Sequence, residues 1–77
     1  MNTLTTQQKF EYIVEDPFYS TIHQCLVRVD DYGIMYVGDD LDQVHFEGLT
    51  DGMINVLFEE WMKFQKFLDR VHNWVYE

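Results

Sequence analysis

The first apolar residues of the chain recur at intervals of three and four, which places them on one face of a helix. They are Phe10, Ile13 and Val14. Thr5 and Gln8 form a Thr-x-x-Gln capping box, in which the hydroxyl accepts from the third amide of the helix. Pro17 then restricts the residue before it to extended backbone. We therefore predict a short helix over residues 6–15 that buries these three apolar side chains.

The middle of the chain favours short strands separated by turns. Residues 19–30 are rich in β-branched side chains, and residues 34–37 and 44–47 continue this composition. The last of these segments alternates apolar with polar residues, which is typical of a strand with one wet face. Gly33 supplies the positive φ of a tight hairpin loop, and the acidic segment 38–42 makes a second turn. We therefore predict a three-stranded antiparallel meander.

The last third of the chain shows the clearest helical period. Its apolar seam follows alternating spacings of three and four: Ile54, Leu57, Trp61, Phe64, Leu68, Val71 and Val75. Four further large residues fall outside this narrow seam, namely Phe58, Met62, Phe67 and Trp74. Thr50 or Asp51 can cap the helix, since an acid favours the positive end of the helix dipole. We predict one helix of about 25 residues, which is close to 37 Å long at about 1.5 Å per residue.

These elements predict that residues 1–77 form a single α+β domain with an N-terminal helix, a three-stranded antiparallel sheet and a long C-terminal helix. A compact chain of this length has a radius of gyration of roughly 11–12 Å, so the long helix is about as long as the whole body. Residues 54–64 are expected to face the core. Residues 67–75 are expected either to pack within the chain or to meet a second chain. The residues predicted for self-association as a homodimer are Trp61, Phe67, Trp74 and Val75.

Composition narrows the class of protein. Apolar residues make up 47% and aromatic residues 17% of the chain, which excludes a disordered protein. No apolar run approaches the roughly 20 residues of a membrane helix. The single cysteine excludes an internal disulfide and favours a reducing compartment. Since residues 1–8 lack the features of a signal peptide, we expect a cytoplasmic protein. The formal charge of −9 argues against nucleic acid or an anionic membrane as a direct ligand.

The acidic residues are concentrated in the middle of the chain. Half of the 14 lie in a segment without Lys or Arg: Asp30, Asp31, Asp39, Asp40, Asp42, Glu47 and Asp51. Like charges at this density destabilise a small fold, so some benefit offsets the repulsion. That benefit is solubility, attraction to a basic partner, or cation binding. Duplex DNA carries one charge per roughly 1.7 Å of axis, so a basic nucleic-acid groove can accept a rigid acidic protein. The predicted partner-binding residues are Asp30, Asp31, Tyr32, Tyr36, Asp39, Asp40, Asp42 and Glu47.

Three residues suggest metal or nucleophile chemistry, but their pattern is incomplete. His23 and Cys25 share one face of a predicted strand, and His45 lies on another strand. Zinc needs four ligands, or three and a water, and no fourth ligand has a recognisable spacing. The acidic turn 39–42 lacks the ligand spacing of an EF-hand loop, and there is no glycine-rich phosphate loop. We therefore predict a protein that is not an enzyme and that uses no metal and no cofactor.

One stretch of the chain is similar to a known family. Residues 22–37 follow the pattern Ile-x-Gln-x-x-Val-Arg-Val-Asp-Asp-x-Gly-x-x-Tyr-Val. This pattern resembles the hairpin of small acidic phage-encoded anti-CRISPR proteins, which inhibit the RNA-guided nuclease Cas9. It covers 16 of the 77 residues. The family's acids at the turn and on the returning strand are replaced by Tyr32 and Met35 here, and one long helix stands in place of two shorter ones.

The resemblance implies a fold and a mode of action. The family combines an N-terminal helix, a three-stranded antiparallel sheet and C-terminal helices. It places acidic side chains in the basic cleft with which the nuclease reads the PAM, so that target DNA cannot bind. By this resemblance we expect an acidic inhibitor, a DNA mimic, that blocks a basic nucleic-acid-handling protein in the cytoplasm of a bacterial host. The alternative is a non-catalytic, dimeric regulatory module that works through the C-terminal helix, with the acids serving solubility.

Overall fold

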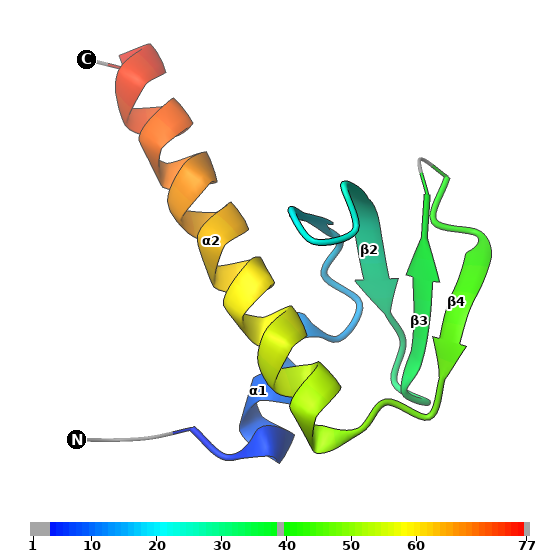
Figure 1. Cartoon of the computed structure of the whole chain (residues 1–77). Coiled ribbons are helices and arrows are strands. Elements are labelled where there is room, and N and C mark those ends of the chain that lie inside the picture. The colour runs from blue at the N-terminus through cyan, green and yellow to red at the C-terminus, as the bar shows by residue number, and fades with distance from the viewer. Residues whose placement is uncertain (1–3, 39, 77) are drawn as a thin grey trace.

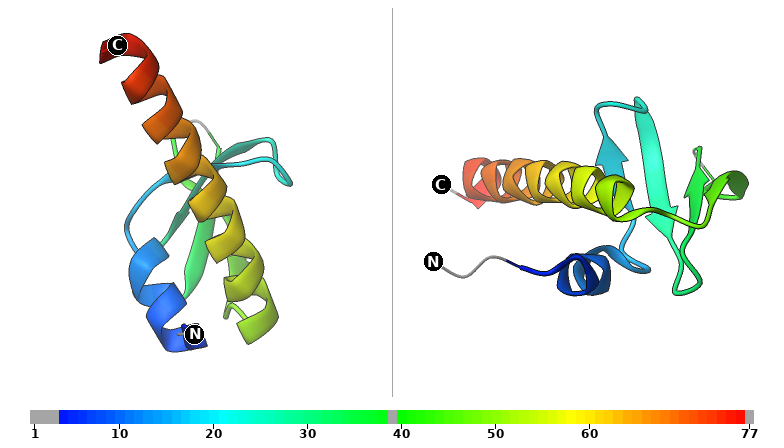
Figure 2. Two further views of the ribbon diagram at one scale, coloured as in Figure 1. Left: turned by 90° about the vertical axis from the view of Figure 1, so that its left-hand side faces the viewer. Right: turned by 60° about the horizontal axis from the view of Figure 1, so that its bottom comes forward.

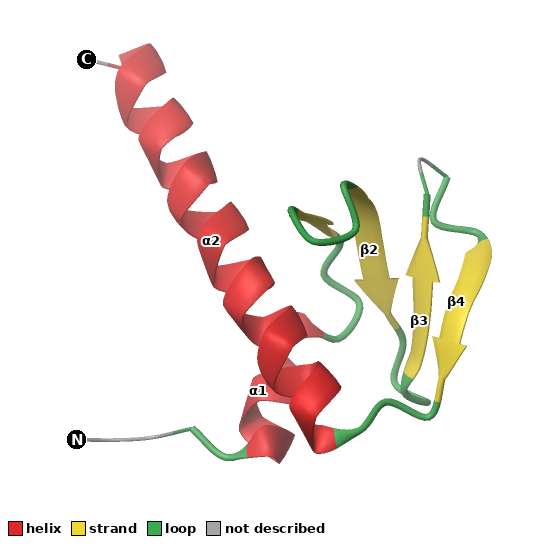
Figure 3. Ribbon diagram, viewed as in Figure 1, coloured by secondary structure: helices red, strands yellow, loops and turns green. Residues whose placement is uncertain are grey.

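The computed structural model describes residues 4–38 and 40–76, which form an α+β fold with two helices beside one antiparallel sheet (Figure 1). In chain order the elements are α1 (Thr6–Ile13), β1 (Phe18–Ser20), β2 (Cys25–Val29), β3 (Ile34–Val37), β4 (Gln43–Glu47) and α2 (Asp51–Tyr76). Both helices lie to one side of the sheet, and α2 packs against α1 and β1 (Figures 2 and 3). At residues 74–76 only the helical backbone is described.

The sheet has four strands in the order β1-β2-β3-β4, one more than the sequence predicts. Residues 19–30 are not one strand, because the chain reverses after Ser20 and joins β1 to β2 as a hairpin. The turn has no glycine; Gln24 takes the positive φ of 56°, and its amide donates to the Ser20 carbonyl at 2.7 Å. The turn residues Thr21 and Ile22 are β-branched, so they imitate a strand in the sequence pattern. The prediction of three strands is therefore wrong at this turn.

A buried glutamate of α2 holds the β1–β2 turn. Glu60 is only 1% exposed, and each of its carboxylate oxygens lies 2.9 Å from the Thr21 hydroxyl. The backbone amides of Thr21 and Ile22 also donate to this carboxylate, each at 3.3 Å. A buried carboxylate needs such donors, so the turn and the helix stabilise each other. Glu60 lies 39 positions after Thr21, and no local pattern reveals a contact of that range.

The capping box predicted for the first helix is confirmed. The Thr5 hydroxyl accepts from the Gln8 amide at 3.2 Å, and the Gln8 side chain accepts from the Thr5 amide at 2.8 Å. The helix ends at Ile13, two residues before the predicted end. Val14 is already extended and forms a bridge with β2, which removes it from the helix. Ile13 is fully buried, while Phe10 and Val14 are half-buried.

The core lies between the two helices and the first three strands. Its buried apolar residues are Ile13, Phe18, Val27, Val29, Met35, Leu57 and Phe58. Leu57 belongs to the predicted seam of α2, but Phe58 falls outside the seam and is still only 8% exposed. The Phe58 ring lies beside Tyr12 of α1, with ring centroids 6.0 Å apart. The helix α2 therefore buries two adjoining faces, one against β1 and one against α1, and its apolar stripe is wider than the seam.

Strand β4 forms where the pattern predicts it but has no buried face. All of its residues are exposed, including Val44 at 49% and Phe46 at 40%. It is an edge strand, and α2 packs against β1 at the opposite edge of the sheet (Figure 1). A cavity of about 390 Å³, lined mainly by apolar residues, lies between β4 and the first turns of α2. The prediction of one wet and one buried face is wrong for β4 because no element packs closely against it.

The long helix α2 extends beyond the rest of the chain (Figure 2). Its cap is Thr50, whose hydroxyl accepts from the Met53 amide at 3.3 Å. Its 26 residues span about 39 Å at about 1.5 Å per residue, against a longest dimension of 42 Å for the molecule. Phe67 is 58% exposed, Leu68 42% and Val71 37%. Of the two expectations for the far end of the helix, packing within the chain is not found for residues 67–73, and contact with a second chain stays a prediction. No helix within residues 4–38 and 40–76 has both the length and the apolarity to cross a membrane.

Candidate functional site: two acidic clusters and an apolar groove

The predicted acidic site is divided between the two ends of the sheet. Asp30 and Asp31 begin the β2–β3 turn, and Glu47 pairs with β3 at the same end. Asp40 and Asp42 lie in the β3–β4 loop at the other end (Figure 1). Consecutive turns of a meander always lie at opposite strand ends, so the predicted topology already implies this division. We name the first three residues the turn cluster and the last two the loop cluster. Position 39 of the predicted site is outside the described residues.

Asp30 is engaged within its own turn. Its Oδ1 accepts from the amides of Tyr32 at 3.0 Å and Ile34 at 2.9 Å, and its Oδ2 accepts from the Tyr36 hydroxyl at 3.1 Å. These bonds, that from the Ile34 amide first, hold the pKa of the Asp30 carboxyl below its ordinary value although desolvation opposes them. The bond to Asp30 also raises the pKa of the Tyr36 hydroxyl. Asp30 and Tyr36 therefore shape the hairpin, whereas Tyr32 is 84% exposed and free of the fold's interior.

Arg28 places a positive charge beside the turn cluster, and this charge was not predicted from the sequence. Its guanidinium lies over the Tyr36 ring, 4.3 Å from the centroid, and pairs with Glu15 at 3.2 Å. The alternation along β2 gives the signal, because positions 28 and 30 lie on one face of the strand. This pair is the only ion pair found among residues 4–38 and 40–76. The exposed carboxylates of Asp31 and Glu47 and those of the loop cluster therefore have no lysine or arginine partner in the described structure.

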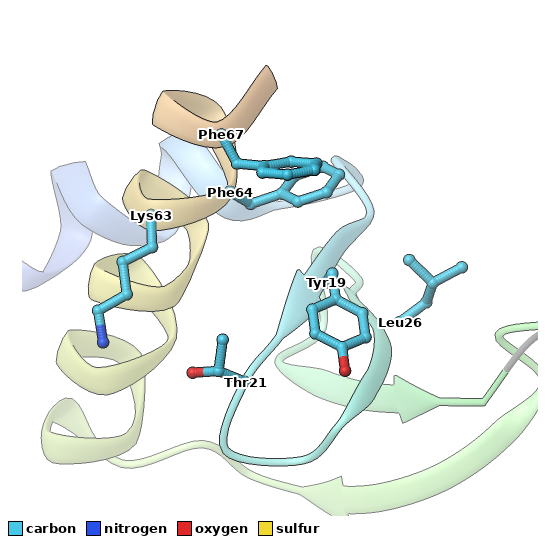
Figure 4. A pocket seen from close by; sticks show the side chains of 6 residues that line it. All are labelled: Tyr19, Thr21, Leu26, Lys63, Phe64 and Phe67. Carbon is cyan, nitrogen blue, oxygen red and sulfur yellow. The ribbon is translucent and has the colours of Figure 1, made fainter. Parts of the chain in front are cut away.

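An apolar groove opens at the β1 edge of the sheet, between α2 and the β1–β2 hairpin (Figure 4). Its volume is about 550 Å³, and its lining residues are Tyr19, Thr21, Leu26, Lys63, Phe64 and Phe67. The rings of Phe64 and Phe67 stack with centroids 6.5 Å apart. Phe67 is one of the residues predicted for self-association. Tyr19 and Leu26 were missed, because the hairpin that carries them is absent from the predicted meander.

Trp61, which is also predicted for self-association, is not among the residues that line this groove. The Trp61 ring packs against α1, with its centroid 5.7 Å from that of Tyr12 and 5.7 Å from that of Phe58. Its indole N–H donates to the Asp16 carboxylate at 2.8 Å. Trp61 is thus part of the contact between the two helices. The side chains of Trp74 and Val75 lie outside the described residues.

Two of the three residues considered for metal chemistry come together. The rings of His23 and His45 lie with centroids 5.2 Å apart, and His23 Nδ1 is 3.0 Å from the Ser20 hydroxyl. Burial first, and then the charge of His45, lower the pKa of the His23 imidazole, although the Glu60 carboxylate opposes this. Cys25 is a free thiol on β2. In the described part of the chain, no three His, Cys, Asp or Glu residues are grouped as a metal ion would require.

Comparisons with protein-family models, with curated proteins and with solved structures gave no match to this chain. The case for a function therefore depends on the two acidic clusters and the groove themselves.

Proposed function

We propose that the protein is a small, non-catalytic inhibitor that binds a basic, nucleic-acid-handling protein and blocks its DNA or RNA site by charge mimicry. The observation that supports this proposal is the set of exposed carboxylates without basic partners on the β3–β4 half of the sheet. Within the described residues no helix packs closely against β4 (Figure 1), so a partner can reach this edge of the sheet without displacing any element. A field of one sign attracts a basic partner and rejects acidic ones.

The spacing of these carboxylates suits an elongated cleft. The turn cluster and the loop cluster lie at the two ends of β4, whose five residues span about 16 Å at about 3.3 Å per residue. Four exposed carboxylates over this length correspond to one charge per roughly 4 Å, comparable with the one per 3.4 Å of a single DNA strand; they are those of Asp31, Asp40, Asp42 and Glu47. Tyr32, at the exposed tip of the turn cluster, adds a rigid aromatic contact. The resemblance of residues 22–37 to anti-CRISPR inhibitors agrees with this mode of binding.

The test compares two triple variants that lose the same charge at different places. The first, the loop triple, replaces Asp39, Asp40 and Asp42 with Asn. The second, the helix control, replaces three exposed acids of the helices: Glu11→Gln, Glu59→Gln and Asp69→Asn. Each protein is immobilised, exposed to a bacterial lysate and eluted with salt from about 50 to 500 mM, a range over which screening removes contacts between exposed charges.

Charge mimicry predicts that one nucleic-acid-binding protein is retained by the wild type and by the helix control but not by the loop triple. That protein should elute as salt rises, and its binding to DNA or RNA should be blocked by the wild-type inhibitor. Equal retention by both triples, or retention that does not respond to salt, refutes the proposal.

A second candidate function is a regulatory module that works through α2. The exposed apolar side chains of Phe67, Leu68 and Val71 and the groove beside them favour it. For this function Phe67→Ala or Trp74→Ala should abolish partner binding, while the loop triple should retain it.

A further inference from the structure

We propose that two copies of this chain associate through the far half of α2, with the helices antiparallel and each helix end covering the groove of the other copy. The contact surface is the far stripe, which we define as Phe64, Phe67, Leu68 and Val71. The proposal concerns α2 and the β1 edge of the sheet, whereas the acidic clusters lie at the two ends of β4 at the other edge, and it does not depend on the proposed function.

The far stripe is an apolar face that its own chain leaves open. Phe67, Leu68 and Val71 are 58%, 42% and 37% exposed, and Tyr19 of the groove wall is 43% exposed. The radius of gyration is 13.1 Å, against about 11.5 Å for a compact chain of this length, because the helix projects from the body. A small monomer rarely leaves aromatic and aliphatic side chains contiguous on a projecting helix, and such patches mark interaction sites.

The distribution of charge on the helix suits a contact with an identical helix. At 100° per residue, the positions that flank the far stripe on one side are Gln65 and His72, which carry neither a carboxylate nor a lysine or arginine. Lys66 and Asp69 point about 150° away from the centre of the stripe, whereas Lys63 and Arg70 lie along its other border, about 90° and 110° from the centre. Two copies with a charge of −9 each can therefore meet here without bringing carboxylates to the centre of the contact, and the charges at its border are those of Lys63 and Arg70. A charged partner would find no opposite charge at its centre.

The acidity of the two bodies selects the antiparallel arrangement. A parallel pair would place both sheets side by side at the same end of the helices, where two acidic bodies repel each other. An antiparallel pair sends the bodies to opposite ends. A two-fold axis near residues 69 and 70 then places Leu68 against the partner's Val71, and places the last turns of each helix at the partner's groove.

The size of the contact predicts a reversible dimer. Aromatic side chains have about 150–250 Å² of surface each, so the exposed parts of Phe67 and Tyr19 amount to roughly 100 Å² each. With the aliphatic residues of the stripe, each copy contributes roughly 400 Å² of apolar surface, or about 800 Å² for the pair. This area is below the roughly 1,200 Å² of specific, stable interfaces and corresponds to a weak, transient contact. We therefore expect a dissociation constant of about 1–100 μM.

Sedimentation velocity over about 0.5 to 500 μM protein tests the proposal, because this range brackets the expected dissociation constant. The decisive variant is Leu68→Glu, which places a charge in the stripe. Its matched control is Met62→Glu. The exposed fraction of Met62, 39%, is similar to the 42% of Leu68, but Met62 lies on another face of α2. The wild type and Met62→Glu should change from monomer to dimer with concentration, whereas Leu68→Glu should stay monomeric with an unchanged circular dichroism spectrum. A wild type that is monomeric throughout, or two variants that behave alike, overturns the proposal.

A separate distance measurement tests whether the two helices are antiparallel. Glu59 is exposed on α2, so a spin label can be attached at Glu59→Cys in a Cys25→Ser background. The two labels should lie about 30 Å apart in the antiparallel dimer, because about 21 residues of helix separate them along the axis. A distance near 15 Å indicates parallel helices and overturns the arrangement.

Discussion

Replacing Glu60 with alanine should lower the free energy of unfolding by about 2–3 kcal/mol, because the β1–β2 turn loses a buried carboxylate that accepts from two backbone amides and a hydroxyl. A chain of 77 residues is stable by about 4–12 kcal/mol, so this loss is a large fraction of the total. The β1–β2 hairpin depends on the same carboxylate. We therefore expect the hairpin and the groove beside it to be lost first.

The pKa of the Glu60 carboxyl agrees with a stabilising role for the carboxylate. Burial alone raises the pKa of the Glu60 carboxyl, but the bonds from Thr21 and Ile22 and the charge of Lys63 lower it by more. The net pKa lies below the ordinary value of 4.5. The fold thus favours the charged form over the neutral one. Glu60→Gln keeps the shape and one acceptor oxygen, but its amide nitrogen is a donor that faces other donors. This substitution should lower the free energy of unfolding by about 1–2 kcal/mol.

A double-mutant cycle isolates the contact. Thr21→Val removes the hydroxyl donor and keeps the backbone amide, so it should cost about 1 kcal/mol in the wild type and little in Glu60→Ala. Urea unfolding followed by tryptophan fluorescence is a suitable assay, because Trp61 packs in the contact between the helices. The difference between the wild type and Glu60→Gln should shrink below pH 4.5, as the carboxylate of the wild type takes up a proton.

The neighbouring Glu59 provides the control. It is exposed on α2, and Glu59→Ala should change the free energy of unfolding by no more than about 0.5 kcal/mol. If Glu60→Ala is as stable as Glu59→Ala, or if Thr21→Val costs the same with and without Glu60, the carboxylate does not hold the turn and the reasoning is wrong.

Two further predictions concern groups around the core. The pKa of the His23 imidazole lies below its ordinary 6.5, lowered first by burial and then by His45, so the unfolded chain binds a proton that the native chain refuses. The wild type should therefore lose stability relative to His23→Gln as pH falls from about 7 to 5.5, measured as the shift in urea midpoint; a relative gain would contradict this. Trp61→Phe removes the 2.8 Å bond to Asp16 and should cost about 1 kcal/mol, whereas Trp61→Phe in an Asp16→Ala background should cost clearly less in the same assay.

The elements that depend on neighbouring residues could be predicted from the sequence. The capping box at Thr5, the turn at Gly33 and the period of α2 all involve residues within about four positions of one another. Such contacts form whatever the rest of the chain does, so their residue types identify them. The α+β class follows from the same patterns. The concentration of carboxylates without basic neighbours is likewise a property of the chain, but their use in binding stays a prediction.

The tertiary structure decided what depends on distant residues. The β1–β2 turn forms because Glu60 supplies a buried acceptor to Thr21, 39 positions earlier, and a β-branched turn without glycine has no local signature. Phe58 is buried because α1 lies beside it, while Phe46 stays exposed because no helix packs closely against β4. Burial is a property of what packs against a side chain, so periodicity indicates an apolar face but cannot say whether another element reaches it. The open stripe of α2 results from the same cause: the helix is longer than the body that a short chain can build against it.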